Sequence, residues 1–252
     1  MNLTGAMTLF KRETHRYLKV YSQTILTPVI SNLLFLMIFG LSIGRDIPGS
    51  DLSYLQFVVP GLVMMGIINN AYQNPSSSII IMKYQGLISN LLTIPLSKGE
   101  ILWAFLASAV LRGLLVGVVT LITALFFVQV GFYSILYIVL ASFFSALLFS
   151  ALGVIVGVWA KSFDQTTFVF SFLLSPLIFL GGVFYPITTL PDLFQTISMF
   201  NPIVYMVDLL RYGFTGYHEF ALLLDVSVVL GFSLVLTAVS YLILRTGWRM
   251  QT

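Results

Sequence analysis

The sequence has no cysteine and very little charge. Its 252 residues include 12 Lys or Arg and 9 Asp or Glu, so that 8% are charged, against ~25% in soluble domains. The absence of cysteine excludes disulfides and thiolate metal sites. No charged residue lies between Asp51 and Lys83, between Arg112 and Lys161, or between Asp164 and Asp192. Because about 18 uncharged apolar residues can cross a bilayer, the chain is predicted to be an all-α polytopic membrane protein.

Side chains for catalysis are also scarce. The two histidines, His15 and His218, are far apart in the sequence and form no metal-binding motif. The G-x-S-x-G, H-E-x-x-H and G-x-x-x-x-G-K-[ST] motifs do not occur. The chain therefore cannot hydrolyse ATP by a P-loop mechanism, and we expect it to bind no cofactor of its own. Its function must come from shape, movement or a partner.

Six apolar stretches are predicted to span the membrane and to make residues 1–252 a single transmembrane domain. They cover residues 24–44, 55–72, 101–128, 134–160, 166–184 and 222–244. Between the second and third stretches lies a mixed segment, 74–99, with Pro75, Pro95 and three serines. A long connection, 185–219, precedes the sixth.

Residues 4–21 have the pattern of an amphipathic helix. Met7, Phe10 and Tyr17 share one side, and Arg12 and Arg16 lie roughly opposite. Such a helix lies in the headgroup plane of a membrane. The alternative is a cationic flank that only fixes the orientation of the chain.

The positions of Lys and Arg predict the orientation, because these residues concentrate in cytoplasmic loops. With six spans, the side of the termini carries nine of them: Lys11, Arg12, Arg16, Lys19, Lys83, Lys98, Lys161, Arg245 and Arg249. The other side carries Arg45 and Arg211. Both termini are therefore expected in the cytoplasm.

Residues 80–97 contain a candidate contact for a soluble partner. A stripe at helical spacing precedes Pro95, which is expected to end the helix, and comprises Leu87, Ile88, Leu91 and Leu92. A short amphipathic helix between two spans can bind a groove on another protein. It can equally lie flat on the headgroups.

Residues 186–219 form a second unusual segment. One helical stretch begins after Pro191, Asn201 and Pro202 interrupt it, and a second follows at 203–214. Each stretch is too short to cross a membrane, which predicts a re-entrant or interfacial pair. Asp208 and Arg211, at spacing i and i+3, are expected to form an ion pair. The alternative is an ordinary amphipathic loop.

Few side chains suggest a transport pathway. Arg112 lies within the third span, where a charge is costly, and we find no acidic partner for it in a span. It either faces a pathway or extends its guanidinium to the headgroups. Phe168, Phe172 and Phe179 line one face of the fifth span, against a pathway, lipid or the protein core. Three G-x-x-x-G pairs, Gly40/Gly44, Gly113/Gly117 and Gly153/Gly157, suit either intrachain packing or dimerisation.

Several motifs of this sequence resemble those of the type-2 permease family of ABC transporters, the membrane subunits of many bacterial exporters. The most specific are G-G-V-F-Y-P at 181–186 and N-P-I-V-Y-M-V-D-L-L-R-Y-G at 201–213. V-V-P-G-L-V-M-M at 58–65 and L-L-T-I-P-L-S at 91–97 also look like the family. The resemblance covers essentially the whole chain.

The resemblance implies a dimer of permeases that docks two copies of a separate ATPase, which binds ATP and Mg. Residues 80–97 would hold the coupling helix, with contacts from Lys83, Leu87, Leu91, Leu92 and Pro95. The hairpin would close the outer end of the pathway, with a gate formed by Pro191, Asn201, Pro202, Tyr205, Asp208 and Arg211. Many relatives have glutamate before the two leucines of the coupling helix, where this chain has Ser89 and Asn90.

The predicted function is that of the membrane subunit of an ATP-driven exporter in the bacterial inner membrane. It would act as a homodimer on an amphipathic, lipid-linked or glycan-type substrate. The alternatives are an ion-coupled secondary transporter or channel, a subunit that only anchors a partner, and a membrane enzyme acting on lipid, against which the missing acid–base pairs weigh. The short loops offer no separate domain for recognising a substrate, so selectivity is expected to reside in the spans.

Overall fold

The computed structural model describes residues 2–43, 52–93 and 95–247, which form helices joined by loops, without a strand in these ranges. The first half contains α1 (Leu3–Leu18), the π-helical η1 (Ser22–Leu26), α2 (Thr27–Ile43), α3 (Tyr54–Tyr84), α4 (Ile88–Thr93) and α5 (Lys98–Leu125). The second half contains α6 (Ile135–Trp159), α7 (Phe163–Phe168), the π-helical η2 (Val169–Leu174), α8 (Ser175–Phe179), the 3-10 turn η3 (Ile187–Thr189), α9 (Asp192–Met199), α10 (Pro202–Thr215) and α11 (Leu222–Thr246).

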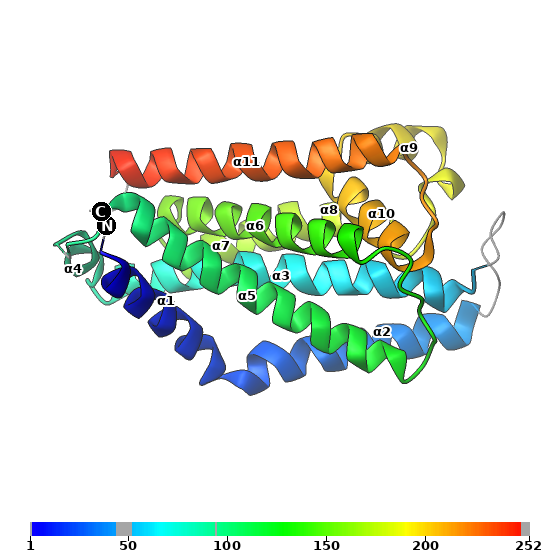
Figure 1. The fold of residues 1–252 in the computed structure, drawn as a ribbon, viewed down its shortest axis with the longest axis horizontal. Coiled ribbons are helices and arrows are strands. Elements are labelled where there is room, and N and C mark those ends of the chain that lie inside the picture. The colour runs from blue at the N-terminus through cyan, green and yellow to red at the C-terminus, as the bar shows by residue number, and fades with distance from the viewer. Residues whose placement is uncertain (1, 44–51, 94, 248–252) are drawn as a thin grey trace.

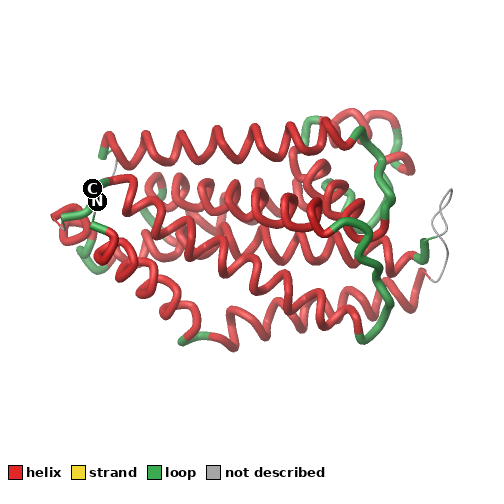
Figure 2. The backbone as a smooth tube through the Cα atoms, in the orientation of Figure 1, coloured by secondary structure: helices red, strands yellow, loops and turns green. Residues whose placement is uncertain are grey.

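The long helices α3, α5, α6 and α11 run along the long axis of an elongated bundle (Figure 1). The start of α1, the end of α11 and the short α4 lie together at one end, which we call the terminal end; α9 and α10 lie at the other, the distal end (Figure 2). Helix α3 is central, since 78% of its most apolar window is buried, compared with 17% for α11. The apolar surface of α11 therefore remains available to lipid.

Local sequence explains where two of the long helices begin. Ser53 and Gln56 form a capping box at the start of α3, and Ser97 and Glu100 form one at the start of α5. Each serine accepts the backbone N–H of the third helical residue, whose side chain in turn accepts the backbone N–H of the serine. These boxes fix the entry of both helices into the bundle.

Helix α3 is longer than the sequence pattern predicted. The second span was expected to end at residue 72, before a loop with Pro75, but the helix continues through Pro75 to Tyr84. Ser76 and Ser77 donate their hydroxyls to the carbonyls of Tyr72 and Gln73, in the turn that contains the proline. The expected helix over 80–95 is consequently divided between the end of α3 and the short α4.

The glycine pairs allow close packing within the chain. A Cβ on Gly153 of α6 would lie 2.3 Å from the Tyr72 carbonyl oxygen of α3, and one on Gly157 would lie 3.1 Å from Ile79. On α5, Gly113 and Gly117 face α3 in the same way. For these two pairs the contacts support packing within the chain, the first of the two roles considered. Gly44 of the third pair lies outside the described residues.

The structure supports between four and six crossings by length and composition. Helices α3, α5, α6 and α11 are each long and apolar enough to span a membrane. Two bent pairs, α1 with Ser22–Ile38 at 83° and α9 with α10 at 86°, also qualify if each pair is taken as one span. The predicted fifth span, 166–184, is helical only over Phe163–Phe179, because the chain leaves the helix at Leu180.

Candidate functional sites at the two ends of the bundle

Arg211 of α10 is the centre of the distal end. Its side chain is 2% exposed, and its guanidinium carbon lies 3.6 Å from the centroid of the Phe57 ring. Nη2 donates to the Gly182 carbonyl at 2.6 Å and Nε to the Phe57 carbonyl at 3.3 Å. Gly182 has a φ of +71°, which a residue with a side chain rarely adopts. One guanidinium thus connects α10, α3 and the turn after α8.

Two carboxylates compensate this buried cation. Nη1 of Arg211 lies 4.0 Å from Oδ1 of Asp208 and 3.7 Å from Oε1 of Glu219. Asp208 also accepts the backbone N–H groups of Glu219 and Phe220 at 2.9–3.0 Å, and Glu219 accepts that of Ile187 at 2.8 Å. Burial raises the pKa of Glu219, while Arg211 opposes the shift. The predicted Asp208–Arg211 pair is therefore part of a larger cluster that closes the loop before α11 onto α10.

The corner between α9 and α10 is built from the residues predicted for an outer gate. Asn201 caps α10 with its side-chain oxygen and donates Nδ2 to the Leu177 carbonyl of α8 at 2.6 Å. Pro202 occupies the first position of α10, where its missing N–H leaves no donor unpaired. Tyr205 donates to the carbonyl of the last α9 residue at 2.6 Å, and Pro191 precedes α9. These contacts fix the 86° bend.

Two acidic residues of this end were not predicted from the sequence. Glu219 was assigned only to a loop, and Asp225, in the first turn of the predicted sixth span, was overlooked when we found no acid in a span. Asp225 is 0% exposed, and neither of its oxygens has a hydrogen-bond partner within the described part of the chain. Its position inside an apolar stretch was the available signal.

At the terminal end, Glu13 attaches α1 to the bundle. Its side chain is 1% exposed, lies 2.8 Å from Arg12 and 3.2 Å from Arg16, and accepts the Ser78 hydroxyl of α3 at 2.6 Å. Arg16 donates to the backbone and side-chain oxygens of Asn74 at 2.7 and 2.9 Å. The helix that was predicted to lie in the headgroup plane is thus bound to α3 through its charged face.

In the predicted coupling segment, most of the apolar stripe faces the protein and not a partner. Ile88 and Leu91 of α4 are 5% and 2% exposed and belong to an apolar core cluster of this chain, whereas Leu87 is 40% exposed. The structure describes α4 through Thr93, but the Leu92 side chain lies outside the described residues. Pro95 is exposed and lies beyond the helix. Most of the described stripe therefore packs inward, and Leu87 faces outward.

Lys83 belongs to α3 rather than to the short helix. Its Nζ donates to the Val158 carbonyl and, at 2.8 Å, to the Ala160 carbonyl at the end of α6. Next to it, the Tyr84 ring stacks on Phe163 of α7 with centroids 5.3 Å apart. These two neighbours connect the end of α3 to the α6–α7 turn.

A groove of about 490 Å³ opens between α1 and the end of α3, beside α4. Its lining combines cations with apolar side chains: Arg12, Glu13, His15, Arg16, Lys19, Val20, Ser78, Ile81, Met82, Gln85 and Leu87. Leu87, the exposed member of the leucine stripe, therefore lines a groove that is both cationic and apolar.

The four pathway candidates lie in different environments. Arg112 is 9% exposed, with its guanidinium carbon 5.7 Å from the centroid of the Tyr17 ring of α1, so it is buried and does not extend to a surface. Phe168 and Phe172 stack on each other at 4.7 Å and are 58% and 71% exposed. Phe179 is 45% exposed. The phenylalanines therefore form an outer face of a single chain.

The architecture is that of a helical membrane permease without a soluble domain in the described ranges. Residues 4–215 match the model of the ABC-2 type transporter family, and the chain belongs to this family. It is 39% identical over 241 residues to the inner membrane transport permease YadH of Escherichia coli strain K12, covering 95% of this chain and 94% of that protein. It is also 24% identical to nodulation protein J of Rhizobium leguminosarum bv. viciae, over 95% of this chain and 93% of that protein.

Membership of this family implies association with an ABC ATPase. A permease subunit of this type is normally not itself the ATPase. The likeness extends over nearly the whole chain, so both ends described above fall within it.

Proposed function

We propose that the chain is the membrane-spanning subunit of an ATP-driven exporter in the bacterial inner membrane. Two copies would form the pathway and bind two copies of an ATPase that holds ATP and Mg. Family membership and the likeness to an inner membrane transport permease support this assignment. Six spans with both termini in the cytoplasm agree with the excess of Lys and Arg at the terminal end.

The groove beside α4 is the observation that carries the proposal. It combines exposed cations with an apolar floor and ends at Leu87, in a part of the chain that we assign to the cytoplasm. A surface helix or acidic patch of a soluble ATPase would complement it. The position of the groove between α1 and the end of α3, next to α4, would let one partner contact both helices together.

The contacts at this end give a route for movement. A displacement of α4 acts on the core cluster through Ile88 and Leu91. It reaches α6 through the Lys83 hydrogen bonds and α1 through Glu13. Because packed cores shift as units and do not deform continuously, ATP-driven closure of the partners would tilt these helices together.

The distal end would then act as the outer gate. We assign α9 and α10 to a re-entrant pair, which Arg211 attaches to α3 near the outer surface. The exposed Phe168, Phe172 and Phe179 would face the second permease copy or the pathway and favour an amphipathic substrate, lipid-linked or glycan-bearing. Arg112, buried beside α1, would serve as a charged element near this pathway.

Leu87→Asp is expected to weaken ATPase binding at least tenfold, because it places a charge in an apolar contact, at a cost of about 1.4 kcal/mol or more. Leu87 is exposed, so the fold should persist; the buried Leu91 is unsuitable for this test. Co-purification of the tagged permease with its ATPase, and ATP hydrolysis by the complex, measure the effect.

The matched control is Leu3→Asp, a 67% exposed leucine of α1 outside the groove. It should retain the ATPase. Equal retention by both variants would contradict docking at the groove, and the absence of any co-purifying ATPase from the unmodified protein would contradict the proposed function.

Asp225 favours one second candidate, an ion-coupled secondary transporter. A buried carboxylate without a hydrogen-bond partner can hold a proton during transport. In that case transport would continue after ATP depletion and stop on addition of a protonophore. The ATP-driven exporter predicts the opposite pattern in inverted membrane vesicles, with transport lost on ATP depletion and retained with the protonophore.

A further inference from the structure

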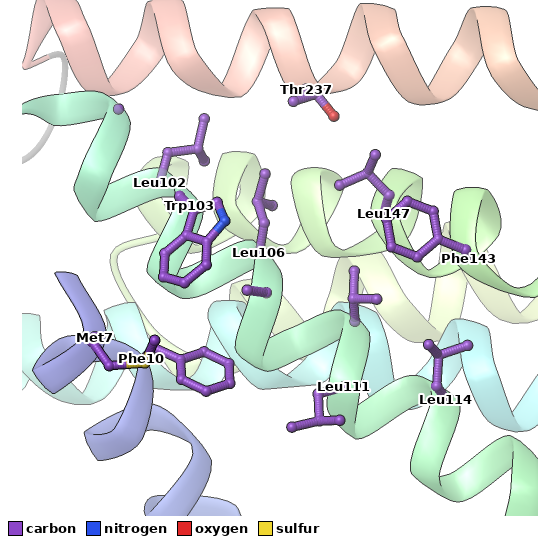
Figure 3. A pocket seen from close by; sticks show the side chains of 13 residues that line it. Met7, Phe10, Leu102, Trp103, Leu106, Leu111, Leu114, Phe143, Leu147 and Thr237 are labelled. Atoms are coloured by element: carbon purple, nitrogen blue, oxygen red, sulfur yellow. The ribbon is translucent and has the colours of Figure 1, made fainter. Parts of the chain in front are cut away.

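A cavity of about 720 Å³ lies between α1, α5, α6 and α11 (Figure 3). Met7 and Phe10 line it from α1, Trp103 and Leu114 from α5, and Phe143 from α6. Apart from Thr237 and the indole N–H of Trp103, its side chains are apolar. Neither of the two end sites described above includes these residues.

The cavity is elongated and open to the side. On α5 its lining extends from Gly99 to Leu114, about 22 Å at a rise of about 1.5 Å per residue. Because one leaflet contributes only about 15 Å of hydrocarbon, a lining of this length is sufficient for an acyl chain of one leaflet. Trp103, Leu111 and Phe143 are 42–49% exposed, so the cavity faces the surroundings of the bundle. This shape fits a hydrocarbon chain that enters from the terminal side.

The mouth has the composition of a membrane interface. The rings of Phe10 and Trp103 are 5.8 Å apart, and a Cβ on Gly99 would lie 3.7 Å from the Tyr241 ring of α11. Amphipathic aromatic rings prefer the level of the lipid headgroups. The mouth therefore lies at the depth where a phospholipid changes from acyl chain to phosphate.

Three cations adjoin residues of this mouth in the sequence. Lys98 precedes Gly99, Lys11 follows Phe10, and Arg245 lies one helical turn beyond Tyr241. Within residues 2–43, 52–93 and 95–247, none of the three forms an ion pair. The nearby Glu100 is engaged in the capping box of α5. The surplus of positive charge matches an anionic headgroup.

We propose that this cavity binds one anionic phospholipid of the leaflet on the terminal side. One acyl chain occupies the groove along α5, and the phosphate lies among Lys11, Lys98 and Arg245. The lipid completes the contact between α11 and the α1–α5 side of the bundle. This site needs neither the ATPase nor the direction of transport, so its test is independent of the proposed function.

Native mass spectrometry of the full chain, released from nanodiscs with equal phosphatidylglycerol and phosphatidylcholine, tests the proposal. We expect one retained phosphatidylglycerol per chain. Ala107→Trp fills the groove and should abolish retention, as should Leu111→Trp at a more exposed lining position. Ile122→Trp, on a 53% exposed position of α5 that lines neither this groove nor the adjoining pocket at Leu114 and Phe143, should retain the lipid.

The headgroup is tested with Lys98→Gln and Arg245→Gln. Each should lower the preference for phosphatidylglycerol about fivefold, which corresponds to ~1 kcal/mol per surface cation. Equal retention of both lipids by the unmodified protein would overturn the charge selection. Retention by both groove-filling variants, or a cavity that is covered by a second copy of the chain in a dimer structure, would overturn the site.

Discussion

Replacing Arg211 by Met is expected to remove about 3–5 kcal/mol of stability, because it leaves Asp208 and Glu219 as buried charges without their cation. The change also leaves the Gly182 and Phe57 carbonyls without their shared donor. Since proteins are stable by only ~5–15 kcal/mol, little folded protein should survive detergent extraction. Thermal unfolding followed by size-exclusion chromatography measures the loss.

Two further variants separate charge from shape. Lys161→Met, on an exposed position of the α6–α7 turn, should change stability by no more than ~0.5 kcal/mol. Adding Asp208→Asn and Glu219→Gln to Arg211→Met should recover part of the loss, because no buried charge then remains unpaired in the cluster. If Arg211→Met unfolds at the same temperature as Lys161→Met, the cluster does not stabilise the distal end.

Arg211→Lys is also expected to lower the unfolding temperature, because the site depends on the shape of the guanidinium as well as on its charge. A single ammonium on a flexible stem lacks the planar group that covers the Phe57 ring at 3.6 Å while donating from two separate nitrogens. The cluster therefore requires arginine even though lysine would conserve its net charge. The Asp208–Arg211 spacing predicted a pair, but only the fold shows that the guanidinium joins three segments.

Sequence periodicity predicted most helices because each is an uninterrupted apolar run of sufficient length. The bounds of α5, α6 and α11 differ from the predicted spans by at most three residues at either end. The first predicted span, 24–44, extends beyond the described residues at Gly44. The prediction failed at Pro75, which was expected to lie outside the helix. In the structure, neighbouring serines and the closely packed α6 accompany a helix that continues through this proline.

The candidate sites were less predictable, because their contacts join residues distant in sequence. Glu13 meets Ser78, and Arg211 meets Gly182, through packing that no local pattern encodes. The leucine stripe of α4 was recognised, but amphipathicity cannot tell whether an apolar face meets a partner or the same chain. Leu91 meets the same chain.

Gly153→Ala should destabilise the protein by the upper part of the ~1–3 kcal/mol range for overpacking, or more. The added Cβ would lie 2.3 Å from the Tyr72 carbonyl oxygen and 2.8 Å from Pro75, so backbone must move. Tyr72 cannot retreat freely, because its hydroxyl donates to the Thr166 carbonyl at 3.0 Å. Gly157→Ala, with nearest contacts of 3.1 Å, should cost less.

The control for helix propensity is Gly231→Ala on α11, where a Cβ would meet nothing within 4 Å. That change should be neutral or stabilise by up to ~1 kcal/mol, because alanine is the better helix former. Unfolding temperatures should therefore fall in the order Gly231→Ala, Gly157→Ala, Gly153→Ala. If the glycines served dimerisation instead, Gly153→Ala would convert dimers to monomers in light scattering without lowering the unfolding temperature. Because the nearest atoms to Gly153 belong to α3 of the same chain, we expect the unfolding temperature to fall.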